Sequence, residues 1–209
     1  MARFEHHVAV AWALGSGYAA FHAFQHQLPW QEAATAAVLC TVGGILPDVD
    51  SPGSRFAEFV FSTGALLGVL IGSHFLHLPL SEVSTLGSAI ALFWMLRWGL
   101  RYLLSQLTTH RGMVHSLPAA AIWGMLVFLA FSGNALDLRL TMATAAVLGF
   151  LSHLVLDELF AFVDASGTRL APKRSFGSVL KLWSSSPLAT ASTYGLVVLF
   201  LWLCWRSLP

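Results

Sequence analysis

The chain has 209 residues, of which only 10% are Lys, Arg, Asp or Glu while 56% are hydrophobic. An average soluble domain carries about 25% charged residues, so this composition excludes an ordinary cytosolic enzyme and a disordered chain. The net charge of +1 excludes a basic nucleic-acid-binding module. We therefore expect one integral membrane domain over residues 1–209, with membrane lipids as partners and no direct binding of nucleic acid.

Apolar stretches in chain order predict the membrane spans, each of which needs about 20 residues to cross the hydrocarbon. Glu5, His6 and His7 interrupt the start of the first stretch, which favours a retained helix over a signal peptide. No stretch alternates apolar and polar residues as barrel strands do. The fold class is thus all-α, a polytopic helical bundle of about seven spans, predicted at 7–26, 33–47 (the shortest), 58–79, 86–104, 116–132, 140–162 and 188–205.

The positive charges divide unequally when the predicted spans alternate across the membrane. Nine fall on the side of the N-terminus, and only Arg139 and Arg206 fall on the other side. Arg97 and Arg101 are counted among the nine because they can snorkel outward from the last turns of the fourth span. Cytoplasmic loops carry the excess of Lys and Arg, so we expect an inner-membrane protein with a cytoplasmic N-terminus. The nine are Arg3, Arg55, Arg97, Arg101, Arg111, Arg169, Lys173, Arg174 and Lys181.

Acidic and imidazole side chains fall in four stretches at that same membrane face. Ionisable groups near the hydrocarbon are costly, so each one is a candidate for function. The alternative for any single side chain is a structural role, in which it forms a hydrogen bond between two helices. The seven candidates are His7, Asp48, Asp50, His110, His115, His153 and Asp157.

The spacing within each stretch predicts its local geometry. His153 and Asp157 are four residues apart, so on a helix they share one face. Asp48 and Asp50 lie between two prolines, which favours a turn or an extended loop in which both point to one side.

The stretch from His110 to His115 contains Gly112, which suggests a break before the next helix. Ser116 and Pro118 then read as the cap and first turn of that helix. His115 would stand at a helix N-terminus with Arg111 close by, an arrangement suited to an anion such as phosphate.

Mixed imidazole and carboxylate ligands suit a divalent transition metal, with Zn or Mn preferred and Fe also compatible. Seven ligands exceed the need of one tetrahedral ion, so we expect one or two ions, with the remaining groups available as a base or as supporting hydrogen-bond partners. Cys40 and Cys204 lie in apolar runs and are expected to be buried.

Two further features have simpler interpretations. His22, His26, His74 and His77 lie at the opposite membrane face and read as interfacial residues. The basic segment 163–187 reads as a cytoplasmic interfacial loop, or as one containing a short amphipathic helix that lies on anionic lipid.

Three motifs, LPDVD, HRGMVHSL and GFLSHLVLD, follow an N-terminal histidine in this order. Together they resemble the YdjM-like family, whose members are described as membrane-bound metal-dependent hydrolases, some labelled LexA-binding. The resemblance covers about residues 7 to 185 and implies the seven ligands named above. Ser51, where many members have His, and Val114, where many have Thr, depart from the family pattern; the first departure bears on the number of ions.

These features predict a membrane hydrolase in which a metal-activated water attacks an ester or phosphoester of a small-molecule or lipid substrate. Arg111 would hold the anionic group, and Asp50 or His115 would act as the base. The alternative is a metal or ion transporter or a metal-sensing regulatory protein. Transporter ligands are expected near the bilayer midplane, whereas these lie at one face. A regulatory anchor is a further alternative, but it needs a soluble surface that this sequence lacks.

Overall fold

The computed structural model describes residues 3–50, 57–58, 61–66, 68–69, 83–107, 113–162, 182–184 and 186–208. Within these ranges every regular element is a helix, which confirms the predicted all-α class. The chain divides into two compact units, residues 1–47 together with 111–209, and residues 48–110.

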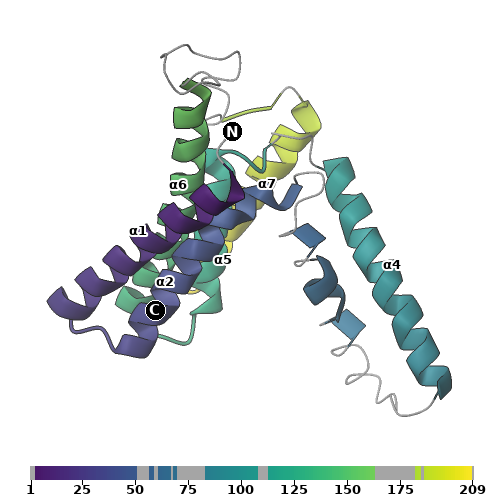
Figure 1. Cartoon of the computed structure of the whole chain (residues 1–209), viewed down its shortest axis with the longest axis horizontal. Helices are drawn as coiled ribbons and strands as arrows, with labels where there is room; N and C mark the ends of the chain where they lie inside the picture. Colours follow the sequence, from purple (N-terminus) through teal and green to yellow (C-terminus); the bar gives the residue numbers. More distant parts are fainter. Residues whose placement is uncertain are drawn as a thin grey trace. The chain divides into compact units, whose positions relative to one another are not determined.

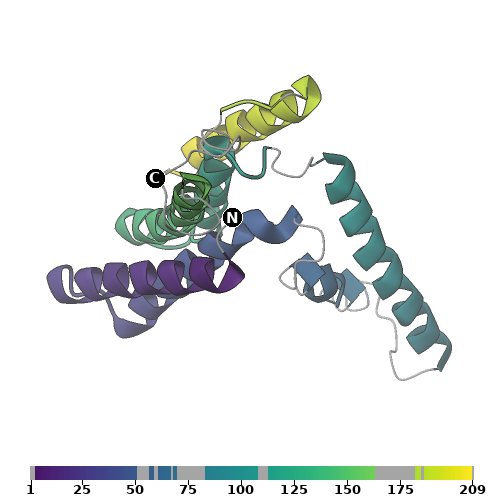
Figure 2. The same ribbon diagram turned by 45° about the horizontal axis from the view of Figure 1, so that its top comes forward.

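The first unit contains helices α1 (Phe4–Gln25), α2 (Trp30–Ile45), α5 (Leu117–Ala130), α6 (Leu136–Phe162) and α7 (Pro187–Arg206). Each begins and ends within a few residues of a predicted span. Helix α6 packs against α1, α2 and α5, while α7 packs on α5 (Figures 1 and 2). Because α6 contacts three neighbours, it supplies more of the buried hydrophobic side chains than any other described helix.

Helices α2 and α6 approach closely because glycines line their crossing. A Cβ atom on Gly149 of α6 would collide with the backbone of Cys40, and one on Gly43 of α2 would collide with the carbonyl oxygen of Ala146. Small residues let two helix backbones come together where a hydrophobic driving force is weak, as in a membrane. This crossing holds the next turn of α6 against the end of α2, where the candidate site begins.

The crossing predicts the effect of adding a single methyl group. We expect Gly149→Ala to destabilise the protein by about 1–3 kcal/mol, because the new Cβ has no room beside Cys40. Gly17→Ala on α1 is the matched control, since nothing lies within 4 Å of its Cβ position. Alanine forms helices better than glycine, so the control is expected to unfold at or above the parent temperature. Equal unfolding temperatures in detergent for the two variants would contradict this packing.

Arg139, near the start of α6, ties the ends of two other helices together. Its side chain is buried, and it donates hydrogen bonds to the carbonyl oxygens of Phe128 (3.3 Å) and Ser207 (2.8 Å). The guanidinium lies 3.9 Å from the centroid of the Phe128 ring. These carbonyls belong to the C-terminal ends of α5 and α7, which carry partial negative charge. From the sequence, Arg139 was assigned only to one side of the membrane, whereas its side chain also holds the end of α7.

Two helices of the described chain are long and apolar enough to cross a membrane, Leu136–Ala161 and Pro187–Arg206, with mean hydropathies of 1.6 and 1.7. Leu117–Ala130 is apolar but shorter. No residue of α7 is buried, and its exposed side chains include Val198, Leu201 and Trp202. The predicted helical architecture is confirmed, while the count of seven spans is not, since among the described residues only these two helices are clearly able to cross a membrane.

The second unit contains α4 (Val83–Leu107) and the helical residues 57–58, 61–66 and 68–69. Most of the predicted span 58–79 lies outside the described residues. Glu58 forms ion pairs with Arg97 and Arg101, and Arg97 Nε also donates to Ser62 Oγ at 3.0 Å. Both arginines lie farther from the end of their helix than the sequence predicted, because α4 continues to Leu107, and both pair with Glu58.

Candidate metal centre

The described residues contain six buried polar or charged side chains, and four of them gather in one cluster of the first unit. Ser116 and Arg139, the other two, cap α5 and anchor α7. The cluster therefore concentrates most of the buried polar chemistry of the described chain in one place. Its members, called here the His/Asp cluster, are His7, His115, His153 and Asp157.

His153 is fixed by a hydrogen bond to the backbone of a neighbouring helix. Its Nδ1 lies 2.8 Å from the carbonyl oxygen of Gly44 on α2. A carbonyl oxygen only accepts, so Nδ1 carries the proton, and the Nε2 of the neutral ring carries the lone pair. A backbone carbonyl on the second ring nitrogen is the usual way in which a metal-binding histidine is oriented. The bond depends on the close crossing of α2 and α6.

Asp157 lies one helical turn beyond His153, as the sequence predicted. Its Oδ2 is 3.9 Å from His153 Nε2, so the two residues share a face of α6. The side chain is only 2% exposed, and within the described residues its Oδ1 has no hydrogen-bond partner. A buried ionised carboxylate is costly unless a cation or hydrogen bonds compensate it.

His7 reaches the cluster from the first turns of α1. Its Nε2 lies 3.4 Å from Asp157 Oδ1. Its ring stacks on that of His153, with centroids 3.8 Å apart and planes inclined by 17°. The neighbouring His6 is exposed and stacks on Phe160 instead. Only His7 of this pair is buried in the cluster.

His115 stands directly before α5, where the sequence analysis placed it. Ser116 caps the helix by accepting a hydrogen bond from the Ala119 amide at 3.3 Å, and Pro118 lies in the first turn, so the predicted cap is confirmed. The Ser116 hydroxyl donates to the Met113 carbonyl, which closes the turn that carries His115. The ring of His115 meets that of His153 edge-on, with centroids 5.5 Å apart and planes inclined by 62°.

Donor atoms of His115, His153 and Asp157 all lie within 4.8 Å of one another. Imidazole nitrogens and a carboxylate oxygen bind Zn at about 2.0–2.2 Å, so a modest contraction brings all three onto one ion. The buried carboxylate of Asp157, whose neighbours in the cluster are imidazoles, gives such an ion an electrostatic reason to bind. The chemistry of the donors therefore fits a divalent transition metal.

Four of the predicted site residues belong to the second unit or have side chains outside the described residues. Asp48 is half-buried in the 3-10 helix η1 (Leu46–Asp50) and is the first residue of the second unit. The side chain of Asp50 lies outside the described residues, as do His110 and Arg111. The cluster thus contains four of the seven predicted ligands.

The predicted local structure around Asp48 is wrong in one respect. Of the predicted turn or extended loop, residues 46–50 form a helical turn, η1, and Leu46 has helical dihedral angles although Pro47 follows it. Proline lacks an amide hydrogen, so it ends the hydrogen-bond ladder of α2 and is tolerated in the first turn of η1. Because residues three apart eclipse in a 3-10 helix, positions 48 and 50 do not share a face.

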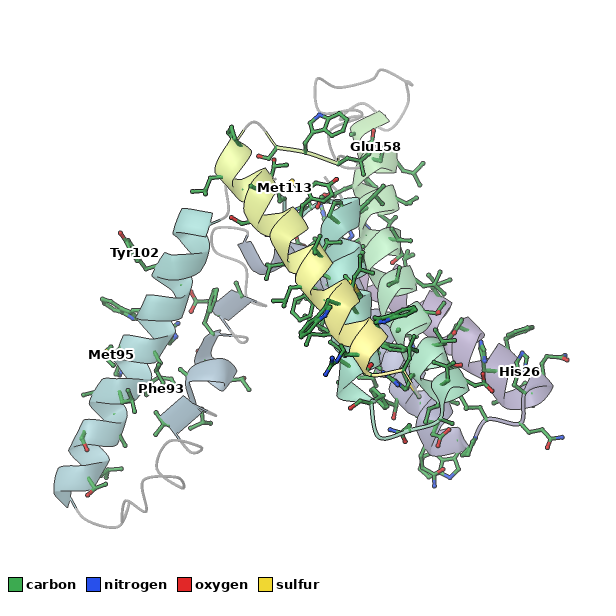
Figure 3. The ribbon with its side chains drawn as sticks, turned by 180° about the vertical axis from the view of Figure 1, so that it is seen from behind. His26, Phe93, Met95, Tyr102, Met113 and Glu158 are labelled. Atoms are coloured by element: carbon green, nitrogen blue, oxygen red, sulfur yellow. The ribbon has the colours of Figure 1, made fainter. Side chains whose placement is uncertain are left out.

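His22 and His26 lie at the other end of the first unit. Figure 3 shows His26 toward the end opposite to Met113 and Glu158, which flank the His/Asp cluster in sequence. The rings of His22 and His26 stack with centroids 4.9 Å apart, and His26 is exposed. This position agrees with the interfacial interpretation, while His74 and His77 lie outside the described residues.

Comparison with known proteins identifies a family. No curated protein and no solved structure matches the chain. A family model described as YdjM inner membrane protein matches residues 1–208, nearly the full length of the sequence. The chain therefore belongs to the YdjM inner membrane protein family.

Proposed function

We propose that this inner membrane protein is a metal-dependent hydrolase that cleaves an ester or phosphoester at the cytoplasmic face. The observation that supports it most is the His/Asp cluster, in which three imidazoles and one carboxylate are all at most 2% exposed. Polar groups are buried at such cost where they bind a ligand or do chemistry. Packing alone does not require four of them at one point.

In this proposal His115, His153 and Asp157 hold a divalent cation, Zn or Mn. The ion supplies a Lewis acid and a water molecule whose pKa is lowered toward about 7. The Gly44 carbonyl keeps His153 Nε2 aimed at the ion position. Asp48, Asp50 and His110, predicted from the sequence, are further ligands in this proposal. Asp50, where it is not committed to an ion, accepts the proton, and Arg111 binds the anionic group of the substrate.

The topology predicted from the positive charges implies that the site lies at the cytoplasmic face of the membrane. We expect Thr109→Cys and Ser178→Cys to react with a membrane-impermeant maleimide only after the cells are opened. Asn134→Cys, in the connection between α5 and α6, should react in intact cells. The background protein carries Cys40→Ala and Cys204→Ala. Labelling of position 109 or 178 from the same side as position 134 would contradict the charge-based topology.

The function itself is tested by measuring bound metal in detergent-purified protein and then assaying phosphatase, phosphodiesterase and lipase substrates with that metal. Release of product, abolished by a chelator and restored by the same metal, would support the hydrolase. Metal-loaded protein that hydrolyses nothing but carries the ion into proteoliposomes would favour the transporter. The position of His7 in the first turns of α1, and of His115 just before α5, supports a site near one face.

A further inference from the structure

The relative orientation of the His7 and His153 rings determines whether these two histidines can bind the same ion. The lone pair of an imidazole nitrogen lies in the plane of its ring, so a bound metal lies near that plane. The two rings are stacked 3.8 Å apart and nearly parallel. An ion midway between their planes would lie about 1.9 Å out of each, nearly the whole metal–nitrogen distance of about 2.0–2.1 Å. Distance alone would let the two histidines share an ion, but the ring orientation does not.

His115 and His153 have the opposite relation. Their planes are inclined by 62° with centroids 5.5 Å apart, so the two planes intersect nearby and an ion close to that intersection can lie near the plane of both rings. Donor atoms of both also lie within 4.8 Å of Asp157. The geometry therefore allocates His153 to the ion held by His115 and leaves His7 to a different position.

The two oxygens of Asp157 face different imidazoles. Oδ2 lies 3.9 Å from His153 Nε2, and Oδ1 lies 3.4 Å from His7 Nε2. The second distance exceeds the usual range of about 2.7–3.2 Å for a hydrogen bond. Two ligands of one tetrahedral ion, each at about 2.0–2.1 Å, lie about 3.4 Å apart. The spacing of His7 and Asp157 thus fits two ligands on either side of a cation.

We infer that Asp157 is a bridging carboxylate between two metal positions, one completed by His115 and His153 and the other by His7. This inference rests on the proposed metal-dependent function and specifies the substrate class. Paired ions about 3.5–4 Å apart stabilise the attacking and leaving oxygens of an in-line displacement at phosphorus. The substrate predicted on this basis is a phosphate ester rather than a carboxylic ester.

The test is to load the detergent-purified protein with Mn²⁺ and measure ions per chain together with the electron paramagnetic resonance spectrum. The parent should bind two ions with the spectrum of a spin-coupled pair. His7→Phe keeps an aromatic ring against His153 but removes the ligand, so it should bind one ion with the hyperfine pattern of an isolated Mn²⁺. His6→Phe, the same change at the adjacent exposed position, should behave as the parent. His7→Gln repeats the measurement if His7→Phe does not fold.

The outcomes separate this inference from the proposed function. A parent that binds a single ion, which His7→Phe retains, overturns the bridged pair and leaves the hydrolase proposal standing. A His7 variant that folds but loses all metal overturns the assignment of His7 to a separate position. A parent that binds no transition metal overturns both proposals.

Discussion

Asp157→Asn is expected to abolish metal binding and activity together while the protein stays folded. The amide has the same shape as the carboxylate but lacks its charge, and both of the original oxygens face imidazoles of the His/Asp cluster. Loss of even a supporting hydrogen-bond partner costs about 10–100-fold in metal affinity. Loss of the only carboxylate in the described cluster should cost more than about 100-fold. Metal content and size-exclusion behaviour of the purified variant measure the two parts of this prediction.

Asp137→Asn provides the control for that variant. Asp137 lies on the same helix, in its first turn, and is exposed. Its substitution should leave both metal content and turnover at the parent level. If Asp157→Asn also retained the full metal content, the cluster would be a set of hydrogen-bonded packing partners and the metal proposal would fail.

Arg111→Lys is expected to lower turnover by about 10²–10³-fold while metal content stays at the parent level. Lysine keeps the positive charge but loses the planar pair of donors that binds a phosphate oxygen pair. The effect should be confined to anionic substrates, so a neutral ester assayed in parallel should not respond. Steady-state kinetics on both substrates, with metal content measured on the same samples, separate this role from metal binding.

Arg169→Lys is the matched control, since Arg169 is another arginine on the predicted cytoplasmic side. It should turn over both substrates at the parent rate. Parent-like turnover of the phosphoester by Arg111→Lys would remove Arg111 from the site and would favour a neutral ester substrate.

Local sequence patterns predicted those parts of the site that depend on one helix. The spacing of four residues placed His153 and Asp157 on one face, and Ser116 with Pro118 placed the start of α5. The helices themselves follow from long apolar runs, because such runs must satisfy their backbone groups internally in lipid.

Features that depend on contacts between helices could not be predicted in this way. The hydrogen bond from His153 to Gly44 joins residues 109 positions apart and requires the glycine-lined crossing of α2 and α6. The same holds for the ion pairs of Glu58 and for the bonds from Arg139 to the end of α7. The charges of Glu58 and Arg139 beside apolar runs indicate that each needs a partner. The partners cannot be identified from the sequence, because they lie far away along the chain.

X-ray absorption spectroscopy of the zinc-loaded protein tests the central claim most directly, because it reports the atoms bound to the metal. The account predicts a first shell of nitrogen and oxygen at about 2.0–2.1 Å, with the outer-shell scattering of imidazole rings, and its loss in His153→Ala. A shell containing sulfur at about 2.3 Å would place the ion on Cys40 or Cys204 instead. That result, or an unchanged spectrum in His153→Ala, would contradict a metal centre built on the His/Asp cluster.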